Sequence, residues 1–198
     1  MNIDKVARNI GYRNSAVDGF STPEMLARKC ISMVPLVRGD VVLDPCRGYG
    51  AFYNNYPDFV KKDWCEIAEG RDFFDYDKKV DWIISNPPYS KIDKWLEKSF
   101  SVCEKGVGYL FGIFNMTPRR IEMANNNGFG LTLLHLCKVG DWFGQSVFVI
   151  FEKGKKNIIS FDRNRYYGEG FRIDVIKKQK GRPKILEWFK VGEEMETE

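Results

Sequence analysis

The stretch Gly39-Asp40-Val41-Val42-Leu43-Asp44-Pro45-Cys46-Arg47-Gly48-Tyr49-Gly50-Ala51-Phe52 predicts a strand that runs into an acid and then into a glycine-rich turn. Glycine lets a backbone bend this sharply and lets a ligand approach it closely. A Gly-x-Gly pair alone is a weak signal, but a strand, Asp-Pro and Gly-x-Gly-x-Phe in one unit form a stronger one. The stretch therefore predicts a ligand-binding turn at the end of a strand in an α/β fold. A plain tight strand-to-helix turn is the alternative.

A second strand end follows farther along the chain. Ser85-Asn86-Pro87-Pro88-Tyr89 comes directly after the apolar run 80–84, and Ser85 lies 41 positions after Asp44. The two prolines fix the backbone and remove N–H donors. What remains is a set of acceptors, the Asn86 side-chain oxygen and the backbone carbonyls, beside the Tyr89 ring. This set suits a flat substrate that carries an amino group.

The rest of the chain alternates strand and helix patterns. Ser21 or Thr22, followed by Pro23 and Glu24, predicts the start of a helix that ends near Pro35. Two further helices are expected at 92–100, closed by Gly106, and from Thr117 to about 125–128. The remaining strands are predicted at 64–67, 107–114, 131–139 and 146–151. The pattern predicts an α/β, Rossmann-like, mostly parallel sheet with helices on both faces and an antiparallel C-terminal β-hairpin at its edge.

Length and composition bound the protein class. The chain has 198 residues and a formal net charge of +4, which suits one domain and is compatible with nucleic acid. Its five cysteines are odd in number and lack metal-ligand spacing, so we expect reduced, mostly buried thiols in a cytoplasmic protein. No apolar run approaches 18 residues, and no membrane or metal is expected. The lone His135, on an apolar strand, is expected to be a core residue.

Three regions are predicted: a flexible N-terminal arm at 1–19, the main domain at 20–153, and a basic, aromatic extension at 154–198. Residues 163–190 contain nine Lys or Arg against three acids, with five aromatic residues among them. Such a mixture suits a phosphate backbone and unstacked bases, although a solvated surface hairpin explains it almost as well. The expected nucleic-acid contacts are Arg119, Arg120, Lys177, Lys178, Lys180, Arg182 and Lys184.

Between about Phe20 and Glu152 the sequence resembles the class I S-adenosylmethionine-dependent amino-methyltransferases, specifically the DNA adenine-N6 methyltransferases. Asp44-Pro45-x-x-Gly48-x-Gly50-x-Phe52 looks like the family's cofactor loop. Asn86-Pro87-Pro88-Tyr89 looks like its catalytic tetrapeptide, and Phe20-Ser21-Thr22-Pro23 is similar to the segment before the cofactor loop. The family's large sequence-reading region has no counterpart here, and Arg47 departs from the small or apolar residues usual in that loop.

The resemblance implies a role for each matching residue. Asn86 and the Pro87 carbonyl would accept hydrogen bonds from the target amine, and Tyr89 would stack on the target base, with Pro88 completing the catalytic set. Thr22 would help hold the methionine carboxylate, Glu66 would bind the ribose hydroxyls, and Asp72 would accept from the adenine amino group. The implied S-adenosylmethionine contacts are Phe20, Thr22, Asp44, Pro45, Gly48, Gly50, Phe52, Glu66, Ile67, Asp72, Phe73 and Asn86.

The implied reaction is methyl transfer to the N6 amine of an adenine that has been flipped out of DNA. The same tetrapeptide serves enzymes that methylate RNA adenines and enzymes that methylate a glutamine side chain. An inactive methyltransferase-like subunit that binds nucleic acid is a further alternative. DNA is the preferred partner, and the oligomeric state is left open.

Overall fold

The computed structural model describes residues 22–139 and 144–164, which contain a six-stranded sheet. The strands are β1 (Val41–Asp44), β2 (Lys61–Trp64), β3 (Val80–Ser85), β4 (Cys103–Gly112), β5 (Phe129–Cys137) and β6 (Ser146–Lys153). Their order across the sheet is β2-β1-β3-β4-β6-β5. Strands β1 to β4 are parallel, and β6 runs antiparallel to both of its neighbours. The predicted Rossmann-like, mostly parallel sheet is confirmed. The hairpin differs in one respect: of its two strands, β6 lies inside the sheet, between β4 and β5, and β5 forms the edge.

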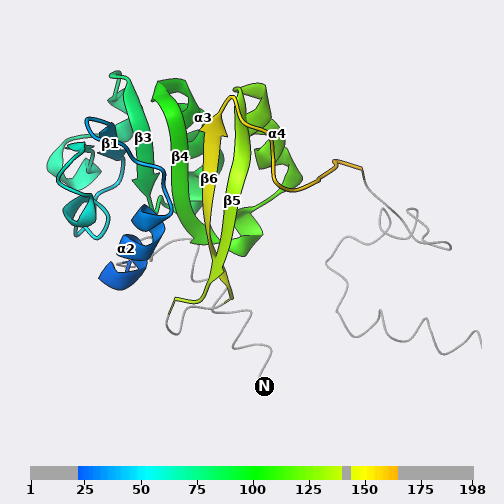
Figure 1. Ribbon diagram of the computed structural model, residues 1–198, viewed down its shortest axis with the longest axis horizontal. Coiled ribbons are helices and arrows are strands. Elements are labelled where there is room, and N and C mark those ends of the chain that lie inside the picture. The colour runs from blue at the N-terminus through cyan, green and yellow to red at the C-terminus, as the bar shows by residue number, and fades with distance from the viewer. Residues whose placement is uncertain (1–21, 140–143, 165–198) are drawn as a thin grey trace, which may run out of the picture. The chain divides into compact units, whose positions relative to one another are not determined.

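Helices cover both faces of this sheet, as predicted (Figure 1). Helix α2 (Glu24–Ser32) packs against one face, where its Ala27 and Cys30 share a core with Val42 and Ile84. Helices α3 (Ile92–Val102) and α4 (Pro118–Asn126) pack against the other face. Successive residues of β3, such as Ile83 and Ile84, alternate between the two cores because the side chains of a strand alternate in direction.

The connections place a switch point between β1 and β3. From β1 the chain moves to β2 on one side and then returns to β3 on the other side of β1. In open α/β sheets ligands bind at the carboxyl ends of strands where the order reverses in this way. The carboxyl ends of β1 and β3 carry Asp44 and Ser85, so both sequence motifs meet at this point. Short 3₁₀ turns follow the strands there: η1 (Tyr53–Asn55), η2 (Ile67–Glu69), η3 (Phe73–Asp75), η4 (Tyr89–Lys91) and η5 (Ile113–Asn115).

Three local predictions were wrong. The second strand ends at Trp64, not at Ile67, so Glu66 lies in the loop beyond it. Gly106 does not close a helix, because α3 ends at Val102 and Gly106 lies within β4. Helix α2 begins after Pro23 and has no side-chain cap, so the Thr22 hydroxyl is not used there.

The cysteines have the state that the sequence predicts. All five cysteines are free, and Cys30, Cys65 and Cys103 are buried. Within residues 22–139 and 144–164 we find no helix with the length and apolar character needed to cross a bilayer. The predicted arm at 1–19 and nearly all of the basic run at 163–190 lie outside the described residues.

Candidate functional site

A buried hydrogen bond joins the two sequence motifs at the switch point. Ser85 Oγ, at the end of β3, donates to Asp44 Oδ1, at the end of β1, at 2.6 Å. The backbone N–H of Tyr53 donates to Asp44 Oδ2 at 3.2 Å, and that of Cys46 donates to Oδ1 at 3.4 Å. Asp44 is 1% exposed, so these donors replace the water that the carboxylate loses on burial. The carboxylate therefore fixes the loop after β1 against the loop after β3.

Burial raises the pKa of Asp44 from its ordinary 3.8 to about 6, and the bond from Ser85 only partly opposes this shift. A carboxyl whose pKa is higher in the folded state binds its proton more tightly there than in the unfolded chain. Its contribution to stability is complete below pH 3.8 and is lost as the pH rises through about 6.

We therefore expect the free energy of unfolding of the wild type to fall, relative to that of Asp44→Asn, as the pH rises from 4 to 7. The difference between the two proteins should change by about 2 kcal/mol over this range, because one pKa unit corresponds to about 1.4 kcal/mol and the unfolded carboxyl is already partly ionised at pH 4. Hydrogen bonds altered by the substitution change the difference in unfolding free energy by the same amount at every pH. The change of that difference with pH therefore reports the titration of Asp44 alone. Denaturant unfolding at several pH values measures it, and a difference independent of pH would contradict the argument.

The glycine loop is held open by local geometry. Gly48 and Gly50 have φ values of +51° and +86°, which side-chain-bearing residues rarely adopt. The Gly48 N–H donates to Glu66 Oε2 at 2.7 Å, and Glu66 Oε1 accepts from the Ala68 N–H at 3.2 Å. Glu66 thus connects the loop after β1 with the loop after β2, and its oxygens retain lone pairs for a ligand.

Arg47, the residue that departs from the family pattern, turns back onto the protein. Its guanidinium pairs with Glu69 and lies 3.9 Å from the centre of the Trp64 ring. The guanidinium of Arg71 lies 4.1 Å from the centre of the same ring. Arg71 in turn pairs with Asp63 at 2.7 Å. The Arg47 charge therefore stabilises the junction of the β1 and β2 loops.

The opposite end of the site is aromatic. Trp95 of α3 stacks on Phe73, with ring centres 5.2 Å apart, and meets the edge of Phe74 at 5.3 Å. Asp72 Oδ1 accepts from the Phe74 N–H at 2.9 Å, and no bond to Oδ2 is found within the described part of the chain. Phe73 is buried, whereas Phe74 is 38% exposed and Ile67 is 73% exposed.

The tetrapeptide presents its asparagine between two hydroxyl groups. Asn86 Nδ2 donates to Thr22 Oγ1, and the Tyr89 hydroxyl donates to Asn86 Oδ1, both at 3.2 Å. The Cys46 thiol donates to the Asn86 backbone carbonyl at 3.5 Å and lies 3.2 Å from Ser85 Oγ. Pro87 is buried, and Tyr89 packs against the core beside the cavity.

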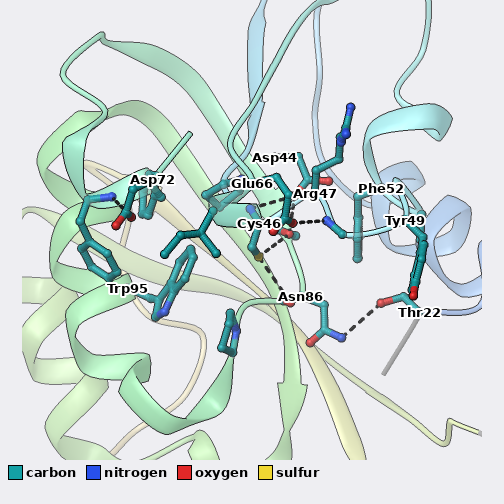
Figure 2. Close-up of a pocket in the computed structure, with 18 of the residues that line it drawn as sticks. Thr22, Asp44, Cys46, Arg47, Tyr49, Phe52, Glu66, Asp72, Asn86 and Trp95 are labelled. Atoms are coloured by element: carbon teal, nitrogen blue, oxygen red, sulfur yellow. Dashed lines mark hydrogen bonds between the residues drawn. The ribbon is translucent and has the colours of Figure 1, made fainter. Parts of the chain in front are cut away.

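A cavity of about 400 Å³ unites these groups. Figure 2 places Thr22 and Tyr49 at one end of it and Asp72 and Trp95 at the other, with Asp44, Cys46 and Glu66 between them. The cavity wall includes eleven of the predicted site residues: Thr22, Asp44, Pro45, Gly48, Phe52, Glu66, Ile67, Asp72, Phe73, Asn86 and Pro88. Gly50 is absent from the wall and shapes the turn behind it.

Several wall residues carried no sequence signal for this site. They are Cys46, Arg47, Tyr49, Ala51, Phe74, Ser85, Lys91 and Trp95, none of which was among the predicted site residues. Trp95 lies in the helix expected at 92–100, and only the fold brings it against Phe73, next to Asp72. Ser85 could have been identified, since a serine at the end of a buried strand needs a partner.

The predicted nucleic-acid residues have mixed placements. Arg120 is largely buried, donating to Asp93 at 2.6 Å and to the Asn115 carbonyl at 2.7 Å, and so it joins α4 to α3. Arg119 also pairs with Asp93, at 3.2 Å, but its side chain is exposed. Phe20, Lys177, Lys178, Lys180, Arg182 and Lys184 lie outside the described residues.

Comparison with known proteins identifies the fold. No protein-family model matches the sequence, and neither does any curated protein. Among solved structures, a methyltransferase from Pyrococcus furiosus matches with 18% identity and a TM-score of 0.54, over 77% of this chain and 98% of that one. A Listeria monocytogenes protein provisionally assigned to the class I S-adenosylmethionine-dependent methyltransferases matches with 10% identity and a TM-score of 0.55, over 76% of this chain and 65% of that one.

A third match extends the same pattern. Precorrin-6y C5,15-methyltransferase from Geobacter metallireducens has 10% identity and a TM-score of 0.52, over 71% of this chain and 94% of that one. At these identities the similarity is one of fold. The chain therefore has the Rossmann-like fold found in class I S-adenosylmethionine-dependent methyltransferases.

Proposed function

We propose that this protein transfers the methyl group of S-adenosylmethionine to the N6 amino group of adenine in DNA. One observation carries the proposal. The acceptor-bearing Asn86 and the glycine loop at Gly48 border one cavity, and the Asp44–Ser85 hydrogen bond joins their strands. On this proposal, the sites for the positively charged methyl donor and for the planar amine are adjacent at the switch point.

The cavity residues fit the cofactor from one end to the other. Gly48 offers an exposed backbone without a side chain, and Glu66, which also lines the cavity, offers carboxylate oxygens that can accept from ribose hydroxyls. Asp72 Oδ2 can accept from an adenine amino group beside Phe74 and Ile67. Between the two ends of the cavity, the Asp44 carboxylate favours the positively charged amino group of the methionine part. When bound, S-adenosylmethionine would supply a methyl group on a positively charged sulfur.

Asn86 acts on the amine that receives this methyl group. An aromatic amine is a poor nucleophile because its nitrogen lone pair is delocalised into the ring. Asn86 Oδ1 and the Pro87 carbonyl, as two acceptors, favour a pyramidal nitrogen with its lone pair free for attack. The nitrogen gains the methyl group as the methyl–sulfur bond breaks, with that electron pair staying on sulfur, and the methylated nitrogen then releases a proton to solvent. Positioning supplies most of the rate enhancement, and a base in a duplex must be flipped out to reach Asn86.

Lys91 supports an anionic polymer as the substrate. It lines the cavity at the end of η4, two residues after Tyr89, and it is exposed. The other cation in the wall, Arg47, is paired with Glu69, whereas Lys91 has no ion pair within residues 22–139 and 144–164. A phosphate next to the target nucleotide would match this charge, and a glutamine side chain in a peptide would not require it.

Transfer of labelled methyl groups tests the proposal directly. The protein and labelled cofactor are incubated with single- and double-stranded DNA, RNA of the same sequences, and a peptide containing glutamine. We expect label in DNA, recovered as N6-methyladenine after digestion. Label only in RNA or only in peptide would replace the proposed substrate, and failure to bind the cofactor would favour an inactive subunit.

Lys91→Gln should raise the KM for DNA about fivefold at physiological salt, because one favourable phosphate contact is lost. The slope of log affinity against log salt should decrease in magnitude by about 1. Lys94→Gln is the matched control, since Lys94 is also exposed, lies about one turn further on and does not line the cavity. A larger effect on the KM for the cofactor than on that for DNA would place Lys91 at the cofactor instead.

A further inference from the structure

Thr22 has an unexpected partner. A threonine followed by Pro-Glu is a helix-start signature, yet α2 has no side-chain cap. Thr22 is instead 7% exposed, borders the cavity, and accepts a hydrogen bond from Asn86 Nδ2 at 3.2 Å. Because Thr22 and Asn86 are 64 positions apart, this contact exists only in the folded site.

The hydroxyl of Thr22 has one proton and can therefore donate only once. In the structure its oxygen accepts from Asn86, and no acceptor for its proton is found within the described part of the chain. The proton is thus available to an acceptor in the cavity. On the proposed function, that acceptor is the carboxylate of the methionine part.

Asn86 lies between two hydroxyl groups, and hydroxyl groups can donate or accept. In the observed orientation Nδ2 faces Thr22 and Oδ1 accepts from Tyr89. If the amide turned over, Thr22 could donate to the oxygen and Tyr89 could accept from the nitrogen. The two hydroxyls alone therefore leave both amide orientations able to form hydrogen bonds.

We infer that Thr22 is a positioning residue that fixes the catalytic amide only when a carboxylate occupies the cavity. Once the Thr22 proton is donated to that carboxylate, the Thr22 oxygen can only accept, and Asn86 must present Nδ2 to it. The Oδ1 atom then faces the target side, where it can accept from an amine. This inference rests on the proposed function and adds that the cofactor's carboxylate prepares the target site.

Coupling between two sites commonly changes affinity by about 5- to 150-fold. Fixing one amide orientation should give a change in the lower part of that range. The test measures binding of a methylatable oligonucleotide with and without saturating S-adenosylhomocysteine, which keeps the carboxylate. For the wild type we expect about tenfold tighter binding with S-adenosylhomocysteine. With 5′-methylthioadenosine, which lacks the amino-acid part, we expect no tightening.

Two variants assign the effect to Thr22. Thr22→Val has nearly the same shape but no hydroxyl, and should lose the tightening by S-adenosylhomocysteine. Thr22→Ser keeps the hydroxyl and should retain it. Calorimetry sets a saturating ligand concentration for each variant, and thermal melting confirms that each is folded.

Retention of the tightening in Thr22→Val, or tightening by 5′-methylthioadenosine in the wild type, would overturn the inference. The 5′-methylthioadenosine comparison uses the unaltered protein, so it decides the matter even if a variant fails to fold. Methylation of the same oligonucleotide by the wild type is measured first. Its absence would instead overturn the proposed function, so the two failures are distinguishable.

Discussion

Replacing Asn86 with alanine should reduce kcat for methyl transfer by at least about 10²- to 10³-fold, the loss typical when a group that stabilises developing charge is removed. Asn86 Oδ1 is the side-chain acceptor that faces the target amine in the proposed reaction, and alanine offers none. Its bonds to Thr22 and Tyr89 show that both polar ends of the amide have partners in the folded protein. The affinity for S-adenosylmethionine should change much less, because Asn86 meets mainly the amine.

Single-turnover kinetics and calorimetry separate these two effects. Asn126→Ala is a suitable control, because Asn126 is exposed on α4 and does not line the cavity. The control should keep wild-type kcat and cofactor affinity. Wild-type kcat in Asn86→Ala would remove Asn86 from the catalytic role, and an equal loss in the control would point to general destabilisation.

The site could be predicted from the sequence wherever chemistry depends on strand ends. Asp44 and Asn86 each follow a buried apolar run, and parallel strands bring their carboxyl ends to one edge. The order of the motifs was therefore enough to predict that they face one cavity. The Gly48 turn was predictable for a similar reason, since its backbone needs a φ that other residues avoid.

The partners of these residues were not predictable, because they come from distant parts of the chain. Thr22 resembles a helix cap locally, but it contacts Asn86. Arg47 could have faced a phosphate or solvent, but the fold places Trp64 and Glu69 next to it. Local patterns carry no information on which of two satisfactory partners the folded chain brings closer.

Gly106 shows how an error in a helix boundary arises from the same cause. A glycine after an amphipathic helix is a common helix end, which made 92–100 followed by Gly106 a reasonable prediction. In the structure the helix ends at Val102, and Cys103 already belongs to β4. Gly106 lies opposite Trp82 on β3, and a Cβ at Gly106 would lie 2.4 Å from Trp82 Cζ3. The glycine provides room for the indole ring, a requirement that exists only between paired strands.

Gly106→Ala should consequently destabilise the protein by about 3 kcal/mol, near the upper end of the usual cost of overpacking a core. The added Cβ would meet both Trp82 and the Phe151 carbonyl, 2.9 Å away, so neither moving the ring alone nor shifting β4 alone relieves the overlap. Because Trp82 is buried, its side chain has no solvent to move into. Denaturant unfolding of the wild type and the variant measures the loss.

Two more glycines of β4 make an internal series. A Cβ at Gly108 would lie 2.9 Å from the Phe148 ring, and one at Gly112 would meet only Asn115, at 3.8 Å. None of the three has the positive φ that would add backbone strain, so differences among them report packing alone. We expect the order Gly106→Ala, Gly108→Ala, Gly112→Ala from most to least destabilised, with the last within about 0.5 kcal/mol of the wild type. Equal losses at Gly106 and Gly112 would mean that strand flexibility, and not space for Trp82, accounts for the glycine.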